Sequence, residues 1–206
     1  MSLFARFLNT FQRSGEPTRA VRWIEDTTPG FAELMSAHGG ATFDDGLYRL
    51  HTPDSQIAAN EWVAEGFPAI AGHVACFGYD WLGRQFALDL RDTARTAILL
   101  IEPGTGEVLE IPSTFIDFHN DELVEQQEAA LARSFFDSWS RANADLLPLE
   151  PNVCVGYRIP LFLGGLDEVA NLERTDLDVY WSLSAQLLSQ TRRLDPGTHV
   201  GRVRIE

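Results

Sequence analysis

The sequence predicts an α+β fold, with a mainly antiparallel sheet, flanking helices and two packed subdomains. Helix-like and strand-like segments follow one another without the regular alternation of βαβ units, which favours antiparallel pairing. Residues 97–101 and 107–111 are apolar-rich and flank Pro103-Gly-Thr-Gly106, a spacing typical of a β-hairpin. The chain has 206 residues, 45% of them hydrophobic, which is enough for one sizeable domain or two small ones.

The N-terminal part is expected to hold three helices and a short strand. The first helix ends near Ser14-Gly15, and its apolar residues fall at helical spacing: Leu3, Phe4, Phe7, Leu8 and Phe11. A second helix covers 31–38 and is stopped by two glycines. After a strand at 46–51, a proline in the first turn marks a third helix that starts at 52–54. We expect its buried face to consist of Ile57, Ala58, Trp62 and Val63.

The middle of the chain is expected to be rich in strands and then to form a long helix. Strands at 73–77 and 85–90, joined by residues 78–83, precede the hairpin. A helix at 121–142 follows, with acidic residues in its first turn and apolar residues at helical spacing: Val124, Leu131, Phe135, Trp139 and Ala142. The loop at 143–151 contains two prolines and is the best candidate for a boundary.

The C-terminal part is expected to form a strand, a helix and a last strand. The first strand covers 153–157. Thr175 and Asp178 have the spacing of a capping box and open a helix that ends at Arg192-Arg193. A turn then leads into the last strand at 199–205.

The charge balance restricts the kind of partner. Thirty acidic residues face sixteen basic ones, all arginine, and the formal net charge is -14. Such a surface repels nucleic acid and anionic membranes and attracts cationic partners. We therefore expect no direct binding of nucleic acid or membranes, although the acidity could equally serve solubility.

The expected location is the cytoplasm. The N-terminal residues lack the uninterrupted apolar run of a signal peptide, and no segment reaches the roughly 20 apolar residues of a membrane span. Cys76 and Cys154 lie in apolar contexts far apart in the sequence, so we expect buried free thiols.

Motifs for catalysis are missing. The chain has no nucleophile elbow, no zinc-binding HExxH helix and no glycine-rich nucleotide motif. No histidine has metal-ligand spacing, so the sequence predicts no catalytic residue, no metal and no cofactor. His119 is expected to cap a helix and face solvent, although it could be half of a metal or acid/base site. The pair Asp44 and Asp45 could bind a cation, but such pairs are usually solvated surface.

The most unusual string runs from Phe77 to Asp89 and combines aromatic residues, carboxylates and an arginine around two glycines. Tyrosine, tryptophan and arginine dominate binding energy at protein interfaces. We expect Trp81 to fill the core, and Tyr79, Asp80 and Arg84 to be freer to face outward. Together with the acidic pair, these are the candidate residues for binding a partner: Asp44, Asp45, Tyr79, Asp80, Trp81 and Arg84.

Three strings in the last third carry a family resemblance: Pro160-Leu-Phe-Leu-Gly-Gly165, Asn171-Leu-Glu173 and Val179-Tyr-Trp181. In this order they resemble the C-terminal domain, formerly of unknown function, of immunity proteins that neutralise type VI secretion DNase toxins. The upstream part is similar, more loosely, to the GAD-like domain of that family. The resemblance implies a GAD-like domain at 1–115 and an immunity-protein domain at 116–206.

What the resemblance implies is an antidote rather than an enzyme. Such a protein binds one cognate toxin, and an acidic chain could occupy the basic groove that a DNase presents to DNA. Two other hypotheses stay open. The chain could be an enzyme or small-ligand protein with a site near Tyr79 to Arg84, which would need a pocket there with a perturbed acid, or an adaptor that self-associates through this turn.

Overall fold

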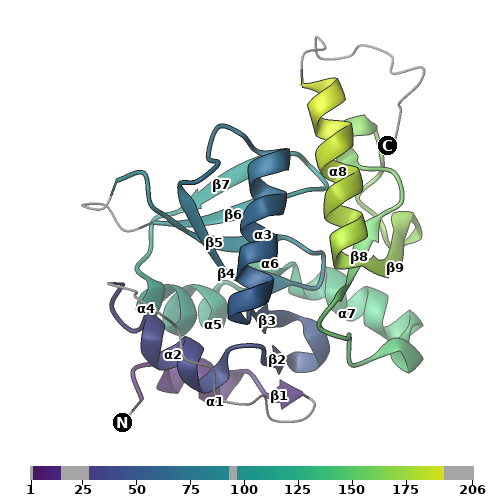
Figure 1. Cartoon of the computed structure of the whole chain (residues 1–206). Coiled ribbons are helices and arrows are strands. Elements are labelled where there is room, and N and C mark those ends of the chain that lie inside the picture. The colour runs from purple at the N-terminus through teal and green to yellow at the C-terminus, as the bar shows by residue number, and fades with distance from the viewer. Residues whose placement is uncertain (1, 15–27, 93–96, 193–206) are drawn as a thin grey trace.

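The computed structural model describes residues 2–14, 28–92 and 97–192. Within them the chain has the predicted α+β fold, with a seven-stranded antiparallel sheet and a separate two-stranded sheet (Figure 1). The strand expected at 199–205 lies outside the described residues.

The large sheet is a meander in which each strand pairs antiparallel with the next strand in the sequence. Its strands are β1 (Arg13–Ser14), β2 (Thr42–Phe43), β3 (Tyr48–Leu50), β4 (Val74–Asp80), β5 (Gln85–Asp89), β6 (Ile98–Glu102) and β7 (Glu107–Ile111). The predicted hairpin is confirmed, because β6 pairs with β7 along its whole length. Strands β4 to β6 are buried on both faces, so helices have to cover both sides of the sheet.

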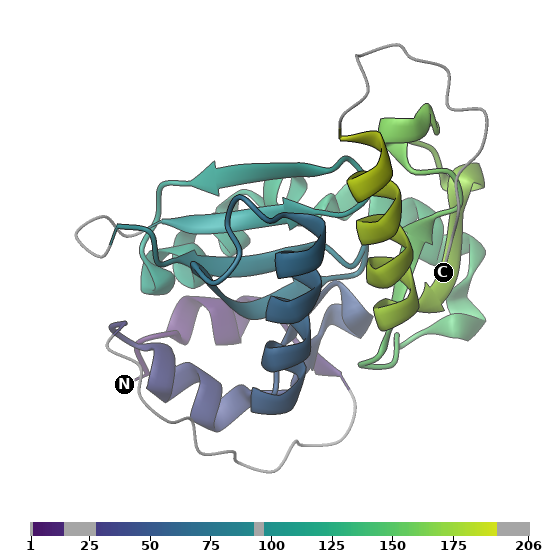
Figure 2. The same cartoon turned by 45° about the horizontal axis from the view of Figure 1, so that its top comes forward.

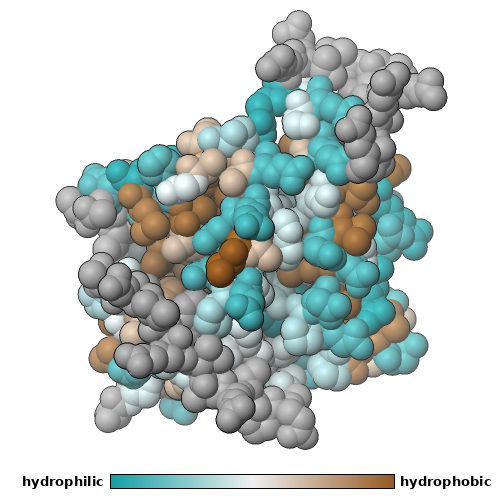
Figure 3. All heavy atoms as spheres, viewed as in Figure 1, coloured by the Kyte–Doolittle hydropathy of each residue, from teal (hydrophilic) through white to brown (hydrophobic). Residues whose placement is uncertain are grey.

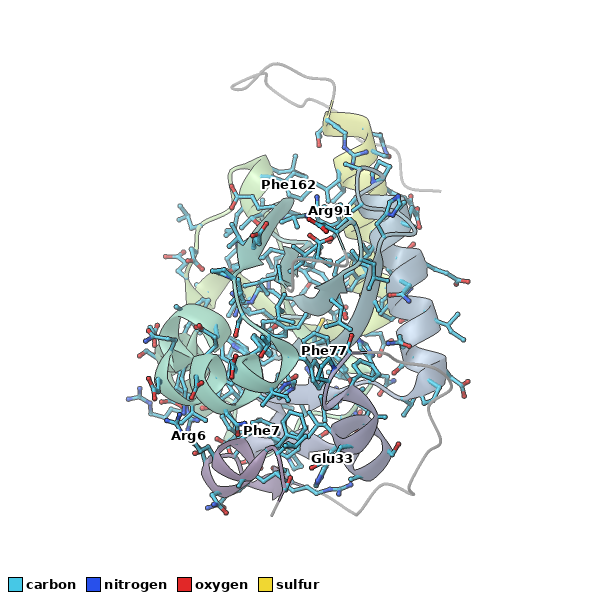
Figure 4. All side chains as sticks on the ribbon, turned by 90° about the vertical axis from the view of Figure 1, so that its left-hand side faces the viewer. Arg6, Phe7, Glu33, Phe77, Arg91 and Phe162 are labelled. Atoms are coloured by element: carbon cyan, nitrogen blue, oxygen red, sulfur yellow. The ribbon has the colours of Figure 1, made fainter. Side chains whose placement is uncertain are left out.

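One face of the sheet is covered by the first helices and by a series of short helices that follow β7. These elements are α1 (Ala5–Thr10), α2 (Phe31–His38), α4 (Phe115–Asp117), a π turn (Phe118–Glu122), α5 (Leu123–Glu125), α6 (Gln127–Leu131) and α7 (Arg133–Ala142). Phe7 and Phe77 lie inside the core on this side, whereas Arg6 projects at the surface (Figure 4). The prediction for α2 is confirmed at both ends.

The opposite face is covered by α3 (Pro53–Gly66) and α8 (Leu177–Thr191), which lie side by side (Figures 1 and 2). The ring of Trp62 on α3 stacks on that of Trp181 on α8, with the centroids 6.4 Å apart. Strands β8 (Val153–Tyr157) and β9 (Leu172–Asp176) form the small sheet, which contacts α8. Short 3₁₀ turns connect these elements at Asp44–Gly46, Ala144–Leu146, Leu161–Leu163 and Val169–Asn171.

The single helix expected at 121–142 is wrong, because the segment is broken twice. Gln126 leaves the helical conformation, and Ala132 adopts a left-handed one with φ of 50°. At the second break, side chains from the sheet take the carbonyl oxygens of the preceding turn: Arg84 donates to Ala130 O and the Trp81 indole donates to Leu131 O. These partners are distant in the sequence, so the local pattern could not show them.

Three smaller expectations are also corrected. The first helix ends at Thr10, because Arg13 and Ser14 join the edge of the sheet as β1. Thr175 belongs to β9, so α8 begins without the expected capping box. On α3, Val63 is buried as expected, whereas Ile57 is 59% exposed and the other buried residues are Ala59 and Gly66.

The capping interactions of α3 and the state of the thiols agree with expectation. Thr52 accepts from the backbone N of Ser55 while the Ser55 side chain accepts from the backbone N of Thr52, so α3 starts at the expected place. Both cysteines are buried and free. The division into 1–115 and 116–206 stays a prediction, since the core on the α1–α2 side draws residues from both parts.

Candidate functional site

The string from Phe77 to Asp89 forms β4, a tight turn and β5, and the turn is organised by a buried carboxylate. Asp80 is fully buried at the end of β4. Its Oδ1 accepts from the backbone N of Leu82 and of Arg84, both at 3.0 Å, and its Oδ2 accepts from Arg84 Nε at 2.6 Å. Burial raises the pKa of Asp80 above its ordinary value, and the charge of Arg84 opposes that rise. Both carboxylate oxygens are therefore used inside the molecule.

Arg84 joins three elements around this carboxylate. Besides Asp80, it donates to Glu102 Oε1 at the end of β6 (2.9 Å) and to Ala130 O in α6 (3.0 Å). The side chains of Arg84 and Glu102 are only 12% and 14% exposed. The group that would act as an acid or base in a catalytic site is thus part of a structural ion-pair network.

The ring of Tyr79 packs against the guanidinium of Arg49, a residue that no sequence pattern indicated. Arg49 is buried on β3, with its guanidinium carbon 4.5 Å from the centroid of the Tyr79 ring. It donates to the carbonyl oxygens of Asp80, Glu150 and Val153, and the Tyr79 hydroxyl donates to Pro151 O at 2.5 Å. These bonds tie the large sheet to the start of β8.

The expectation that Tyr79, Asp80 and Arg84 face outward is therefore wrong. All three side chains point into the molecule, where their polar groups form hydrogen bonds with backbone N–H and carbonyl groups. Trp81 lies in the core, as expected. A role of these four side chains in binding a toxin stays a prediction, but Asp80 and Trp81 are fully buried in this structure.

The acidic pair lies apart from that turn, at the start of a 3₁₀ segment. Asp44 is half-buried and accepts from Arg133 (2.9 Å) and from the backbone N of Gln12 (2.8 Å). Asp45 is exposed and pairs with the Ser14 hydroxyl at 3.1 Å. Of the two, Asp45 is the more accessible to a partner, and the binding role of both stays a prediction.

His119 is not at the surface, in contrast to the expectation. It is fully buried among aromatic rings, accepts the Tyr48 hydroxyl at Nε2 (3.0 Å) and donates from Nδ1 to Phe115 O (2.8 Å). This pair of bonds assigns the proton to Nδ1, since a carbonyl can only accept. Burial lowers the pKa of His119 to about 3, so the ring is neutral at neutral pH.

A pocket of about 460 Å³ opens between the first turns of α3 and α8, and we call it the α3–α8 pocket. Its apolar walls are Leu50, Trp62, Tyr79, Pro151 and Leu177, and its polar lining includes His51, Thr52, Ser55, Asn152 and Asp178. The same face of the molecule is mainly hydrophilic, with separate hydrophobic patches (Figure 3). The pocket brings together segments that are far apart in the sequence.

A smaller pocket of about 190 Å³ lies on the other side of the Asp80 turn. Arg84, Glu102, Tyr157 and Asp167 line it, and the Tyr157 hydroxyl donates to Asp167 at 2.6 Å.

Across residues 2–14, 28–92 and 97–192, no cluster of three or more potential metal ligands occurs. Among the same residues, no helix is long and apolar enough to cross a membrane.

Residues 118–188 match the family model described as the C-terminal part of the T6SS immunity protein Tdi1, where T6SS denotes the type VI secretion system. The match covers about a third of the chain, and this part is similar to that immunity family. A crystal structure of Atu4351 from Agrobacterium tumefaciens is similar in fold, with a TM-score of 0.57 and 17% sequence identity over 90% of this chain and 89% of that one. No curated protein matches the sequence.

Residues of the family strings make close contacts in and around the loop between β8 and β9. A Cβ at Gly165 would lie 1.9 Å from Ile159 O, and one at Gly156 would lie 2.5 Å from the ring of Tyr180. The Asn171 side chain accepts from Ile159 N and donates to Ile159 O and Leu166 O. The strings therefore account for the shape of this domain rather than for a reaction.

Proposed function

We propose that the chain is an immunity protein that binds and neutralises one cognate secreted antibacterial toxin and catalyses no reaction itself. The observation that carries this proposal is the match of residues 118–188 to the T6SS immunity family. The turn around Asp80 supports it as well, because the one perturbed acid there is enclosed by structural partners. The expected location of the protein is the cytoplasm, where the toxin would act.

We further propose that the toxin is a basic nuclease, most simply a DNase, and that this chain covers its active-site groove. A protein with a net charge of -14 can compete with phosphates for a basic groove. Complementary charge also speeds the encounter of the two proteins, which suits an antidote that has to act before DNA is cut.

The test uses the purified chain and the product of the neighbouring toxin gene. We expect a one-to-one complex in light scattering, loss of DNA cleavage at one equivalent of this chain, and an association rate that falls as salt rises. Absence of a complex at low salt would overturn the proposal. A complex whose toxin attacks a substrate other than DNA would keep the immunity function and remove the DNase assignment.

A second candidate function is favoured by one observation, the size of the α3–α8 pocket. A volume of about 460 Å³ lies within the range of small-molecule sites, and Tyr79 is part of its wall. Native mass spectrometry of the purified chain checks this alternative, since a retained ligand adds a defined mass. The same sample, sized by light scattering, shows whether the chain self-associates as an adaptor would.

A further inference from the structure

The helices α3 and α8 lie side by side and run in the same direction, with the start of α8 beside the middle of α3 (Figures 1 and 2). Thr52 and Ser55 from the first turn of α3 line the α3–α8 pocket together with Leu177 and Asp178 from the first turn of α8. At the far ends, Arg192 donates to Gly66 O, which confirms the shared direction. The pocket therefore sits at one end of the surface that the two helices form.

Of the residues that line the pocket, Asp178 is the one with a carboxylate, and the buried guanidinium of Arg49 lies behind the ring of Tyr79. His51 contributes no positive charge at neutral pH, because burial lowers its pKa to about 4 and its ring nitrogens are bonded to Ser55 and Gln85. Asp178 lines the pocket, and its carboxylate accepts only from the backbone N of Val179 in the described part of the chain. Asp54 is exposed in the first turn of α3. The Asp178 carboxylate therefore supplies the negative charge of the lining, at the positive end of α8, and Asp54 adds a second one in the first turn of α3, outside the lining.

Apolar side chains are also exposed on the N-terminal parts of the two helices that contribute to the pocket. Ile57 on α3 is 59% exposed, and Val179 on α8, which directly follows Asp178, is 45% exposed. Within the pocket, Trp62 and Tyr79 present aromatic surface. Protein interfaces commonly bury such an arrangement, in which an anchor side chain fills a pocket and apolar neighbours exclude water around it.

We propose that the α3–α8 pocket accepts an arginine side chain of the toxin, an inference that rests on the proposed immunity function. The methylene stem would lie against Trp62 and Leu177, and the guanidinium would pair with Asp178. A guanidinium suits this site because it is a cation, stacks on aromatic rings and keeps its charge when partly desolvated. Charge complementarity with a basic partner selects this occupant over a neutral apolar one.

The first experiment measures binding of the neighbouring toxin by wild-type chain and three variants. Asp178→Asn removes the paired charge, and Asn152→Arg places a cation of the chain's own at the pocket. We expect each to weaken the complex at least about tenfold, mainly through faster dissociation. The matched control is Glu65→Gln, which removes one exposed carboxylate at the opposite end of α3 and should change the Kd less than about threefold.

If wild type and both pocket variants bind the toxin equally well, the inference is wrong and the immunity function stands. If wild type binds no toxin, the immunity function fails, and a second experiment decides about the pocket.

NMR titration with N-acetyl-arginine amide should shift the indole signal of Trp62 in a saturable way in wild type and much less in Asp178→Asn. An equal response to N-acetyl-leucine amide, or none to either probe, would overturn the assignment of a cationic occupant.

Discussion

The turn at residues 79–84 and the α3–α8 pocket share Tyr79 but use their polar groups in opposite ways. In the turn, both oxygens of Asp80 and the guanidinium of Arg84 are bonded within the molecule. In the pocket, the carboxylate of Asp178 accepts a hydrogen bond only from its neighbouring backbone N among residues 2–14, 28–92 and 97–192. The first arrangement holds elements together, and the second leaves a charge for another molecule.

The difference shows that a string rich in interface-type residues need not form an interface. Aromatic and charged residues at 77–89 are close in the sequence because they build one tight turn, and the turn is buried beneath α6 and α7. The pocket is lined from separate segments at 40–62, 79, 151–152 and 177–178. A binding surface of this kind has no single string by which it could be recognised.

The largest expected effect on stability concerns Arg84 in the turn at residues 79–84. Arg84→Met leaves Asp80 buried without its cation, and we expect the free energy of unfolding to fall by about 3 to 5 kcal/mol. Urea unfolding followed by tryptophan fluorescence measures this change. Adding Asp80→Asn should recover part of the loss, since the uncompensated charge is then gone.

The matched control for Arg84 is Arg91, which pairs with Asp89 at 2.6 Å but is 44% exposed. Arg91→Met should cost less than about 1 kcal/mol, because solvent screens an exposed pair. Equal losses at the two arginines would show that the network around Asp80 has no special structural role.

Elements with local signals could be predicted from the sequence. The hairpin of β6 and β7 followed from its Pro-Gly-Thr-Gly turn, and α2 followed from the glycines after His38. The second break in 121–142 could not be predicted, because Trp81 and Arg84 donate to the carbonyl oxygens before it from 50 and 46 residues away. The apolar character of Ile57 likewise suggested burial, whereas contacts with the sheet and α8 selected Ala59 and Val63.

The candidate site was predicted less well than the fold, for a related reason. Composition indicated an acidic protein, and the strings at 160–181 indicated a similarity to an immunity family that the match of residues 118–188 supports. Arg49, Glu102 and Asp178 were missed because each is ordinary in its own sequence context. Their roles depend on neighbours brought together by the meander of the sheet and by the packing of α8 on α3.

A second prediction uses pH to test the buried aromatic region around His119. The folded chain holds the pKa of His119 near 3, while an unfolded histidine titrates near 6.5. Above pH 6.5 both states are neutral and the residue adds no pH dependence. Below it only the unfolded state takes up the proton, so stability falls with falling pH, by about 2 kcal/mol at pH 5 from this residue.

His119→Gln should remove that share of the acid sensitivity, and the wild-type and variant curves of unfolding free energy against pH should converge toward pH 5. The exposed His73 provides the control for the substitution itself, since His73→Gln removes no buried contact and should leave the free energy of unfolding at pH 7 near the wild-type value. Identical slopes for wild type and His119→Gln would mean that His119 is not held neutral in the folded chain.

The smallest expected effect on stability concerns Asp178 in the α3–α8 pocket. Asp178 interacts with the positive end of α8, so Asp178→Asn should lower the free energy of unfolding by only about 0.3 to 1 kcal/mol. Thermal and urea unfolding of the isolated chain measure this change. A loss as large as that of Arg84→Met would show that Asp178 stabilises the fold of the isolated chain. Its carboxylate would then give no reason to expect an interaction with a partner. A small loss together with a large loss of toxin binding would instead separate the two regions, because a carboxylate that contributes little to its own fold but much to the complex is acting across the interface.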